Sequence, residues 1–373
     1  MVPRARTPPP RRPGRVEPYP QPSRHGDRFA PRSPSPPRLR QLRGVNSADA
    51  HDKLSRRPRS TPWQAPKRTA MPAMRGSEEE MSSNDPTPRP EPTHDRAPAP
   101  RRTDGAPAPY RHVGKGEPVL LIHPFLMTHE VWAEVVDLLA VDHEVLAVTL
   151  PGHWGGPDAR WGRTGAKDMA DAVELVLDEC GWDTCHIVGN SLGGWIAFEL
   201  EQRGRARSVT AIAPAGGWTT LSMPAVRLGA AFLALSPLMI VARPFASWAV
   251  GVRRIQKAAM SVVTAHPAAV PFDAAKRAMN AAIHSRALLP VLWSAVWDGG
   301  LTGLDSTTTP AQLVLCDKDR VIPWRVYARA FLDELPDTAG RLLLPDVGHV
   351  PMLEDPDLVA RTVRGFIAEL AAA

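Results

Sequence analysis

One serine stands where the chain could supply a nucleophile. Residues 189–193 read Gly-Asn-Ser-Leu-Gly, the G-x-S-x-G pattern, with Ser191 at its centre. The pattern follows an apolar run that ends at Gly189, and a helical segment begins at Leu192. Such a strand-to-helix turn needs small residues beside the serine, because its backbone leaves no room for a Cβ on either side. We therefore expect Ser191 to attack from the amino end of a helix.

A serine hydroxyl is a poor nucleophile unless a base takes its proton and a third group orients that base. In the chain order Ser, Asp, His, the acid is predicted to be Asp319, which follows the apolar run 312–316. The base is predicted to be His349, which follows the run 341–344. Both lie after the carboxyl ends of strands, where open α/β sheets place their ligands.

The acid has alternatives. Asp317, Asp346 and Asp355 are also close to these loops in the sequence. Asp317 is very near the end of its strand, whereas Asp319 has the better offset from Pro323, which suits the first turn of the next helix. We favour Asp319.

Acyl transfer also needs two backbone N–H groups to hold the developing oxyanion. Leu192 supplies one, directly after the serine. The second is expected from the loop after the apolar run 119–122, which reads His123-Pro124-Phe125. Proline has no N–H, so Phe125 is the predicted donor. We interpret His123 as a structural loop histidine and not as a catalytic one.

The elements that must position these residues are apolar runs that alternate with helical patterns. The predicted strands are 119–122, 145–150, 186–189, 209–213, 312–316 and 341–344. Helices are predicted over 168–180 and 192–203, from near Pro323, and over about 356–370. Strands that are apolar throughout indicate a mostly parallel sheet covered by helices on both faces, an α/β fold.

These motifs together resemble the α/β-hydrolase superfamily over about residues 110–373. They are Gly-Asn-Ser-Leu-Gly-Gly at 189–194, Leu-Pro-Gly-His at 150–153, Asp-Lys-Asp-Arg-Val-Ile-Pro at 317–323 and Gly-His at 348–349. The resemblance implies that Ser191 is the nucleophile, His349 the general base and Asp319 its orienter. Two residues depart from the usual pattern: Pro124 and Trp154 each stand where a glycine is common.

Within this superfamily, a serine excludes haloalkane dehalogenases and epoxide hydrolases, which attack with aspartate at the same position. It is compatible with esterases, lipases, lactonases, thioesterases and cofactor-free haloperoxidases. C–C bond hydrolases of ring-cleavage products also fit, and 189–191 with 215–217 is faintly similar to them. Their glycine-rich loop is missing after His123, so we rank C–C hydrolysis second. A non-catalytic ligand-binding protein on the same fold is a third possibility.

The segment 218–305 lacks strand patterns, is helical and apolar, and is predicted to be a cap inserted between two strands of the sheet. Five of its side chains either line an apolar pocket or pack against the core, and we favour core packing: Phe232, Leu235, Leu238, Met239 and Phe245. The segment carries a net charge of +5 over a hydrolase body of −10. This excess is either a solvated face, a guide for an anionic substrate, or a contact with an acidic membrane surface.

The basic character of the chain belongs to its first part. Residues 1–110 hold 24 of the 41 prolines and 22 of the 45 Lys and Arg residues, with 11 of the 39 acidic ones. We predict a disordered Pro/Arg-rich tail over 1–105, or a true start at Met71, Met74 or Met81. The hydrolase core is then 106–217 and 306–373, is acidic overall, and gives no reason to expect nucleic acid on it.

The remaining observations set negative expectations. Three cysteines argue against a disulfide framework, no targeting signal is recognisable, and no apolar stretch is long enough to be a transmembrane segment. No metal or cofactor is implied, because no cluster has ligand spacing. The sequence thus predicts a cytoplasmic serine hydrolase that cleaves a small-molecule carboxylic ester through an acyl-enzyme, and it leaves the oligomeric state open.

Overall fold

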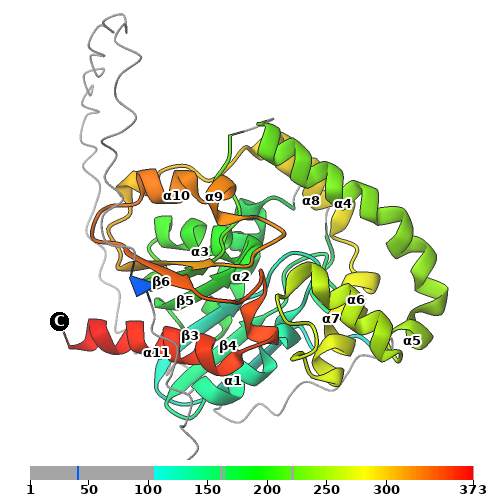
Figure 1. Cartoon of the computed structure of the whole chain (residues 1–373). Coiled ribbons are helices and arrows are strands. Elements are labelled where there is room, and N and C mark those ends of the chain that lie inside the picture. Colours follow the sequence, from blue (N-terminus) through cyan, green and yellow to red (C-terminus); the bar gives the residue numbers. More distant parts are fainter. Residues whose placement is uncertain (1–39, 42–104, 160–161, 163, 220–221, 373) are drawn as a thin grey trace, which may run out of the picture. The chain divides into compact units, whose positions relative to one another are not determined.

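A computed structural model describes residues 40–41, 105–159, 162, 164–219 and 222–372. Eight strands in this part of the chain form one sheet in the order β1-β8-β7-β6-β5-β3-β4-β2 (Figure 1). The strands are β1 (Arg40–Gln41), β2 (Tyr110–Gly114), β3 (Glu117–Ile122), β4 (His143–Val148), β5 (Cys185–Asn190), β6 (Ala206–Ile212), β7 (Ala311–Cys316) and β8 (Gly340–Leu344). β3 to β8 are mutually parallel, and β1 and β2 close the two edges antiparallel. The predicted α/β fold with a mostly parallel sheet is confirmed.

The sheet buries both of its faces, as the unbroken apolar runs predict. Val119 and Leu121 of β3 belong to one core cluster, whereas Leu120 and Ile122 belong to the other. The first cluster lies under α1 (Ala133–Leu139) and α11 (Pro356–Ala371), with the short 3-10 helices η2 (His129–Trp132) and η5 (Pro351–Leu353). The second lies under α2 (Ala166–Glu179), α3 (Leu192–Gln202) and α10 (Arg329–Glu334), next to α9 (Trp324–Tyr327).

Helices alone are found between β6 and β7 in the described residues, where a helical cap is predicted over 218–305. They are α4 (Met223–Ala242), η3 (Arg243–Phe245), α5 (Ala246–Ala249), α6 (Arg253–Val263), α7 (Phe272–His284), α8 (Leu288–Asp298) and η4 (Leu304–Ser306). We call α4 to α8 the inserted helices. α4 and α8 lie side by side beyond the carboxyl ends of the strands (Figure 1). Among the described residues, no helix is long and apolar enough to cross a membrane.

Strands β1 and β2 and helix α1 were not expected from the sequence. β2 is an edge strand whose residues are all half-buried, so its side chains lack the apolar run that marks the inner strands. Arg40 and Gln41 of the predicted tail pair with Leu343 and Leu342 of β8. The rest of the tail prediction, from 1 to 39 and 42 to 104, lies outside the described residues.

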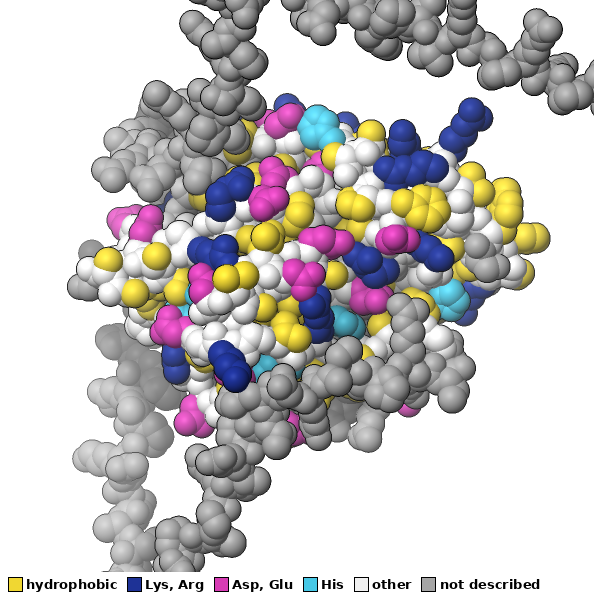
Figure 2. All heavy atoms as spheres, turned by 90° about the horizontal axis from the view of Figure 1, so that it is seen from below, with side chains coloured by type: hydrophobic (Ala, Val, Ile, Leu, Met, Phe, Trp, Pro, Cys, Tyr) yellow, Lys and Arg dark blue, Asp and Glu magenta, His cyan; other side chains and the backbone are white. Residues whose placement is uncertain are grey.

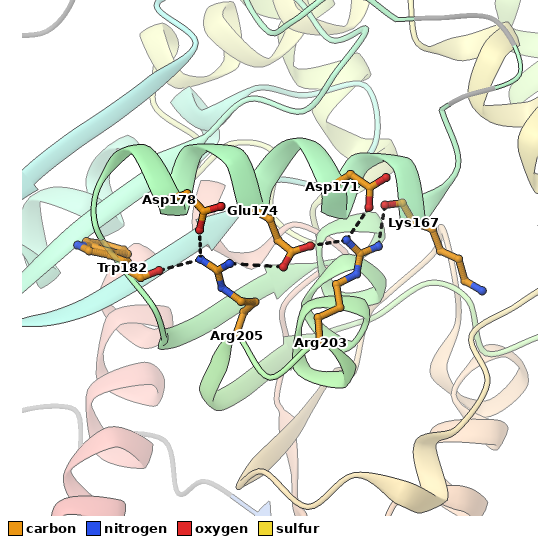
Figure 3. Close-up of polar contacts among 7 residues, drawn as sticks. All are labelled: Lys167, Asp171, Glu174, Asp178, Trp182, Arg203 and Arg205. Carbon is orange, nitrogen blue, oxygen red and sulfur yellow. Dashed lines mark hydrogen bonds and ion pairs between the residues drawn. The ribbon is translucent and has the colours of Figure 1, made fainter. Parts of the chain in front are cut away.

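An ion-pair ladder fastens α2 to the chain between α3 and β6. The Glu174 carboxylate bridges two guanidinium groups, at 2.6 Å from Arg203 and 3.5 Å from Arg205. Asp171 pairs with Arg203 at 2.6 Å, and Asp178 with Arg205 at 2.7 Å. Backbone oxygens of two further residues complete the ladder, Lys167 and Trp182 (Figure 3).

Glu174 should be the residue on which this ladder depends. Its side chain is 25% exposed, and its loss leaves two half-buried arginines short of a partner. We predict that Glu174→Gln lowers the free energy of unfolding by about 1–2 kcal/mol. Asp171→Asn and Asp178→Asn, at carboxylates about 60% exposed, should each cost less than about 0.5 kcal/mol. Urea unfolding of the three variants tests this, and equal losses would contradict it.

Candidate active site

Ser191 lies on a strained turn between β5 and α3. Its backbone has φ 55° and ψ −115°, a conformation that L residues seldom adopt. A Cβ on Gly189 would lie 2.1 Å from the Gly193 carbonyl oxygen, and one on Gly193 would lie 2.2 Å from the Ile122 oxygen. The two glycines of the motif are therefore required by close backbone packing. The turn is also held by hydrogen bonds from Ser191 N–H to Ile212 O (2.9 Å) and from Ala215 N–H to Ser191 O (2.9 Å).

His349 and Asp319 meet in the loops after β8 and β7. His349 Nδ1 lies 2.7 Å from Asp319 Oδ2, and both side chains are almost fully buried. The other carboxylate oxygen of Asp319 accepts the N–H groups of Val321 and Ile322, each at 2.9 Å. The two backbone N–H groups thus fix the orientation of the carboxylate toward the imidazole. With the imidazole, the buried carboxylate has three hydrogen-bond donors, which stabilise its charge. Asp319 thus engages Nδ1 of His349, and Nε2 is the ring nitrogen that remains.

The alternative acids are engaged elsewhere. Asp317 pairs with Lys318 at 3.1 Å, and Asp346 pairs with His266 at 2.9 Å. Asp355 caps α11 by accepting the N–H of Leu358 at 2.9 Å. The structure therefore brings Asp319, and none of these three, to His349.

The predicted oxyanion donors flank the serine. Phe125 and Leu192 both line the same cavity as Ser191. Within the described part of the chain, neither backbone N–H donates a hydrogen bond. Pro124, which replaces a common glycine, accepts instead through its carbonyl: His123 Nδ1 lies 2.7 Å from Pro124 O. A glycine would offer the same carbonyl, so the proline does not alter this contact, and it leaves the Phe125 N–H in place.

His123 is structural, as the sequence interpretation has it. Its Nε2 accepts the N–H of Leu150 at 2.9 Å, so its Nδ1 must carry the proton that Pro124 O accepts. The ring is neutral, and burial, followed by the charge of His153, lowers its pKa well below the usual 6.5. His153 packs against it with ring centroids 4.8 Å apart, and burial lowers the pKa of His153 to about 4. Burial, followed by Arg111, lowers the pKa of His129 to about 4 as well.

Two positioning residues escape sequence reasoning. Asn190, fully buried beside the serine, donates through Nδ2 to the backbone oxygens of Ile212 (2.9 Å) and His349 (3.0 Å). Glu354 accepts from the Gly348 N–H at 2.5 Å and from the His266 N–H at 2.8 Å. Asn190 thus ties the nucleophile turn to the histidine loop, and Glu354 ties that loop to the inserted helices. Asn190 had a signal, because it is the second residue of the motif. Glu354 had none.

Trp154, the second departure from the family pattern, has a structural role. Its ring stacks on that of His284, at the end of α7, with centroids 4.9 Å apart. The tryptophan therefore joins the loop after β4 to the inserted helices.

A cavity of about 600 Å³ opens over Ser191. Among the described residues that line it, Ser191 is the only one with a polar side chain apart from the indole N–H groups of the tryptophans. The core contributes Phe125, Leu192, Trp195, Ala215, Val321 and Ile322, with Trp218 beside them; α4 contributes Ala225, Val226, Leu228, Gly229, Ala230, Phe232 and Leu233; α8 contributes Leu289, Val291, Leu292, Trp293 and Ala295. The cavity thus takes an apolar group and presents it to the serine.

Five side chains of the inserted helices were expected to pack mainly against the core, and the structure places two of them elsewhere. Phe232 lines the cavity and packs edge-to-face on Phe125 at 5.1 Å, so core packing is wrong for it. Phe245 is 62% exposed and belongs to neither place. The side chains of Leu235, Leu238 and Met239 lie outside the described residues. In the same described part of the chain, no group of three or more His, Cys, Asp or Glu could hold a metal ion.

A nucleophile turn after a central parallel strand, with an Asp–His pair from the following loops, defines a class of enzyme fold. Residues 119–362 match the alpha/beta hydrolase family, and the chain belongs to that family. Over 201 residues it is 43% identical to epoxide hydrolase EphH of Mycobacterium tuberculosis, an alignment that spans 54% of this chain and 94% of the relative. This similarity supports hydrolase activity.

Solved structures show the same fold at low sequence identity. A thermophilic esterase from Thermogutta terrifontis superposes with a TM-score of 0.56 and 17% identity, over 70% of this chain and 92% of the esterase. A meta-cleavage product hydrolase from Pseudomonas fluorescens IP01 gives 0.53 and 20%, over 71% and 96%. These similarities establish the fold alone, and they do not identify the substrate.

The acid assignment can be tested directly. If Asp319 orients His349, Asp319→Asn should lower kcat by up to about four orders of magnitude, because the amide favours the wrong imidazole tautomer. Asp317→Asn removes only a contact with Lys318 and should change kcat less than about threefold. Turnover of a soluble ester by both purified variants decides the matter, and the assignment fails if Asp317→Asn is the crippling change.

The buried histidines predict an acid-sensitive fold. Because their folded-state pKa values lie below 6.5, the unfolded chain binds more protons between pH 6.5 and 4, so stability is lost as the pH falls through this window. A shift from 6.5 to about 4 corresponds to about 3 kcal/mol for each histidine. His129→Gln should therefore flatten the pH dependence of the unfolding free energy by up to about this amount. Leu175→Gln, at a side chain that is 64% exposed and does not titrate, is the control and should leave the slope unchanged.

Proposed function

We propose that this protein is a serine hydrolase that cleaves a carboxylic ester of an apolar small molecule through an acyl-enzyme. The observation that carries the proposal is Ser191 beneath a cavity whose walls are apolar. In the reaction, Ser191 Oγ attacks the ester carbonyl while His349 Nε2 takes its proton and later returns it to the leaving alcohol. The N–H groups of Phe125 and Leu192 hold the oxyanion, and Asp319 stabilises the imidazolium. Water, deprotonated by His349, then attacks the carbonyl carbon of the acyl-enzyme, which releases the carboxylic acid and returns the proton to Ser191 Oγ.

Epoxide hydrolysis, the activity in the name of the Mycobacterium tuberculosis relative, is the second candidate. Chemistry argues against attack by Ser191 in that reaction. A carboxylate that opens an epoxide forms an ester, which water can cleave, whereas a serine would form an ether, which it cannot. Epoxide opening here would need water activated by His349, with Ser191 as a bystander.

C–C bond hydrolysis of a keto acid is less favoured than ester hydrolysis. Such substrates carry a carboxylate, and the described residues that line the cavity include no Lys, Arg or His. The eight cations of 218–305 therefore do not reach the described lining of the cavity. The positive charge of that segment therefore does not contribute to substrate binding in the described part of the cavity.

Two measurements test the proposal. A fluorophosphonate probe should label the full chain, and Ser191→Ala should abolish this labelling. A non-catalytic binding protein would not be labelled at all. With p-nitrophenyl esters, kcat/KM should rise about fourfold per added methylene until the cavity is full, because each buried methylene contributes about 0.8 kcal/mol. Leu292→Asp in the cavity wall should flatten this series, and Leu175→Asp, at an exposed position on α2, should not.

Other outcomes point elsewhere. A flat chain-length profile, or a preference for acetyl esters, would refute the apolar acyl site. Conversion of styrene oxide to its diol by both the wild-type protein and Ser191→Ala would establish water attack and epoxide hydrolysis in place of the acyl-enzyme. The cytoplasmic location predicted from the sequence stays a prediction.

A further inference from the structure

The cavity opens at an apolar surface and not at a polar one. Four of its lining residues are also about half exposed: Val226 and Leu233 of α4, and Leu289 and Trp293 of α8. Their exposed fractions are 46–54%. The mouth therefore lies between α4 and α8, and its rim is made of large apolar side chains. A substrate that enters from water would first have to cross this rim.

The apolar surface continues beyond the mouth. Met223 begins α4 and is 62% exposed, and the chain just past the other end of α4 presents Phe245 and Trp248, 62% and 64% exposed. α4 itself has only one charged residue, Arg227, in its 20 residues. A helix without a polar face is ordinarily buried in a core or in lipid. We call Met223, Val226, Leu233, Phe245 and Trp248 the apolar face of the inserted helices.

The charges of the segment that carries this face have one sign as far as residue 272, and Asp273 follows at the start of α7. From residue 218 to 272 the sequence contains no Asp or Glu and five cations, of which Arg227, Arg243, Arg254 and Lys257 are exposed. Hydrophobic side chains with Lys and Arg among them gather at the right-hand end in Figure 2, where α4 and α5 lie. The rest of the hydrolase body is acidic, so the local excess of positive charge is specific to the inserted helices.

We propose that the apolar face docks on an anionic lipid bilayer, with Phe245 and Trp248 in the interface and the surrounding cations on the headgroups. Exposed Trp and Phe beside Lys and Arg are the side chains that bind helices to such an interface. A second copy of this chain is a poorer occupant, because a two-fold interface would bring the same cations face to face.

The docking geometry gives the proposed ester hydrolase its source of substrate. With the face on the bilayer, the mouth between α4 and α8 opens toward the lipid, and an apolar ester passes from the membrane into an apolar cavity without exposure to water. This second part rests on the proposed function. The docking itself does not, and the two can be tested separately.

Docking is tested with the full-length Ser191→Ala protein, in which no turnover occurs. In flotation assays the protein should bind vesicles of phosphatidylcholine and phosphatidylglycerol (3:1) more tightly than vesicles of phosphatidylcholine alone. Adding Phe245→Ser and Trp248→Ser should weaken binding to the mixed vesicles about tenfold or more. Leu175→Ser is the matched control, since Leu175 is 64% exposed on α2, away from the face, and it should change binding less than twofold.

The basic N-terminal residues are present in every variant, so attraction by their charge cannot mimic this difference. Unchanged vesicle binding in the Phe245→Ser/Trp248→Ser variant would overturn docking. So would a loss of self-association by the same variant in sedimentation velocity, together with no vesicle binding by the parent protein, because the face would then be a dimer contact.

The supply of substrate is tested in the active protein. Phe245→Ser/Trp248→Ser should lower hydrolysis of a long-chain ester embedded in the mixed vesicles about tenfold and leave hydrolysis of a dissolved short-chain ester unchanged. Equal losses on both substrates would overturn the supply route. Vesicle binding with no hydrolysis of either ester would refute the proposed function and leave docking in place.

Discussion

The packing around Ser191 depends on the strained backbone conformation of this residue. A residue at φ 55° and ψ −115° is held there only if its surroundings allow no other conformation. Here the chain on both sides approaches neighbouring backbone more closely than a Cβ would permit, at Gly189 and at Gly193. The second of these approaches is made to Ile122, at the end of β3. The turn therefore fixes how α3 sits against the strand whose loop carries the Phe125 N–H.

The same turn is hydrogen-bonded to the loop that carries His349. Asn190 uses both donors of its amide on backbone oxygens, one in β6 and one at His349. Glu354 then holds the histidine loop to residues 265 and 266, which follow α6. Hydrogen bonds thus connect the Ser191 turn, the His349 loop and the chain after α6. The two that Asn190 donates are buried and would be costly to leave unmade, whereas those of Glu354 are part-buried or exposed. The helices α4 and α8, which form the cavity, contact the core through apolar side chains and through two hydrogen bonds, Tyr327 to Pro224 O and Thr164 to Ser294.

The sequence predicts the inner strands and the site residues for a physical reason. Buried parallel strands are apolar on both faces, and their carboxyl ends meet at one edge, so the order of Ser191, Asp319 and His349 indicates their proximity. Edge strand β2 lacks this signal, since its residues are half-buried and mixed in character. Glu354 could not be found, because its role depends on a contact with residues about 88 positions away. The division between cavity and core was also beyond reach: Phe232 and Phe245 look alike in sequence, and only the fold separates them.

Membership of the alpha/beta hydrolase family does not by itself determine which reaction the protein catalyses, because that depends on a few atoms of the site. A relative at 43% identity carries the name of an epoxide hydrolase, yet the residue at the centre of the turn in this chain is a serine. The fate of the covalent intermediate depends on the bond that this residue forms, because an ester to an enzyme carboxylate and an ester to an enzyme serine are both cleaved by water, but an ether is not. The apolar cavity is compatible with an ester or an epoxide. Attack by a serine is compatible with an ester and not with an epoxide, and for that reason the identity of Ser191 bears more on the reaction than the similarity of the surrounding chain does.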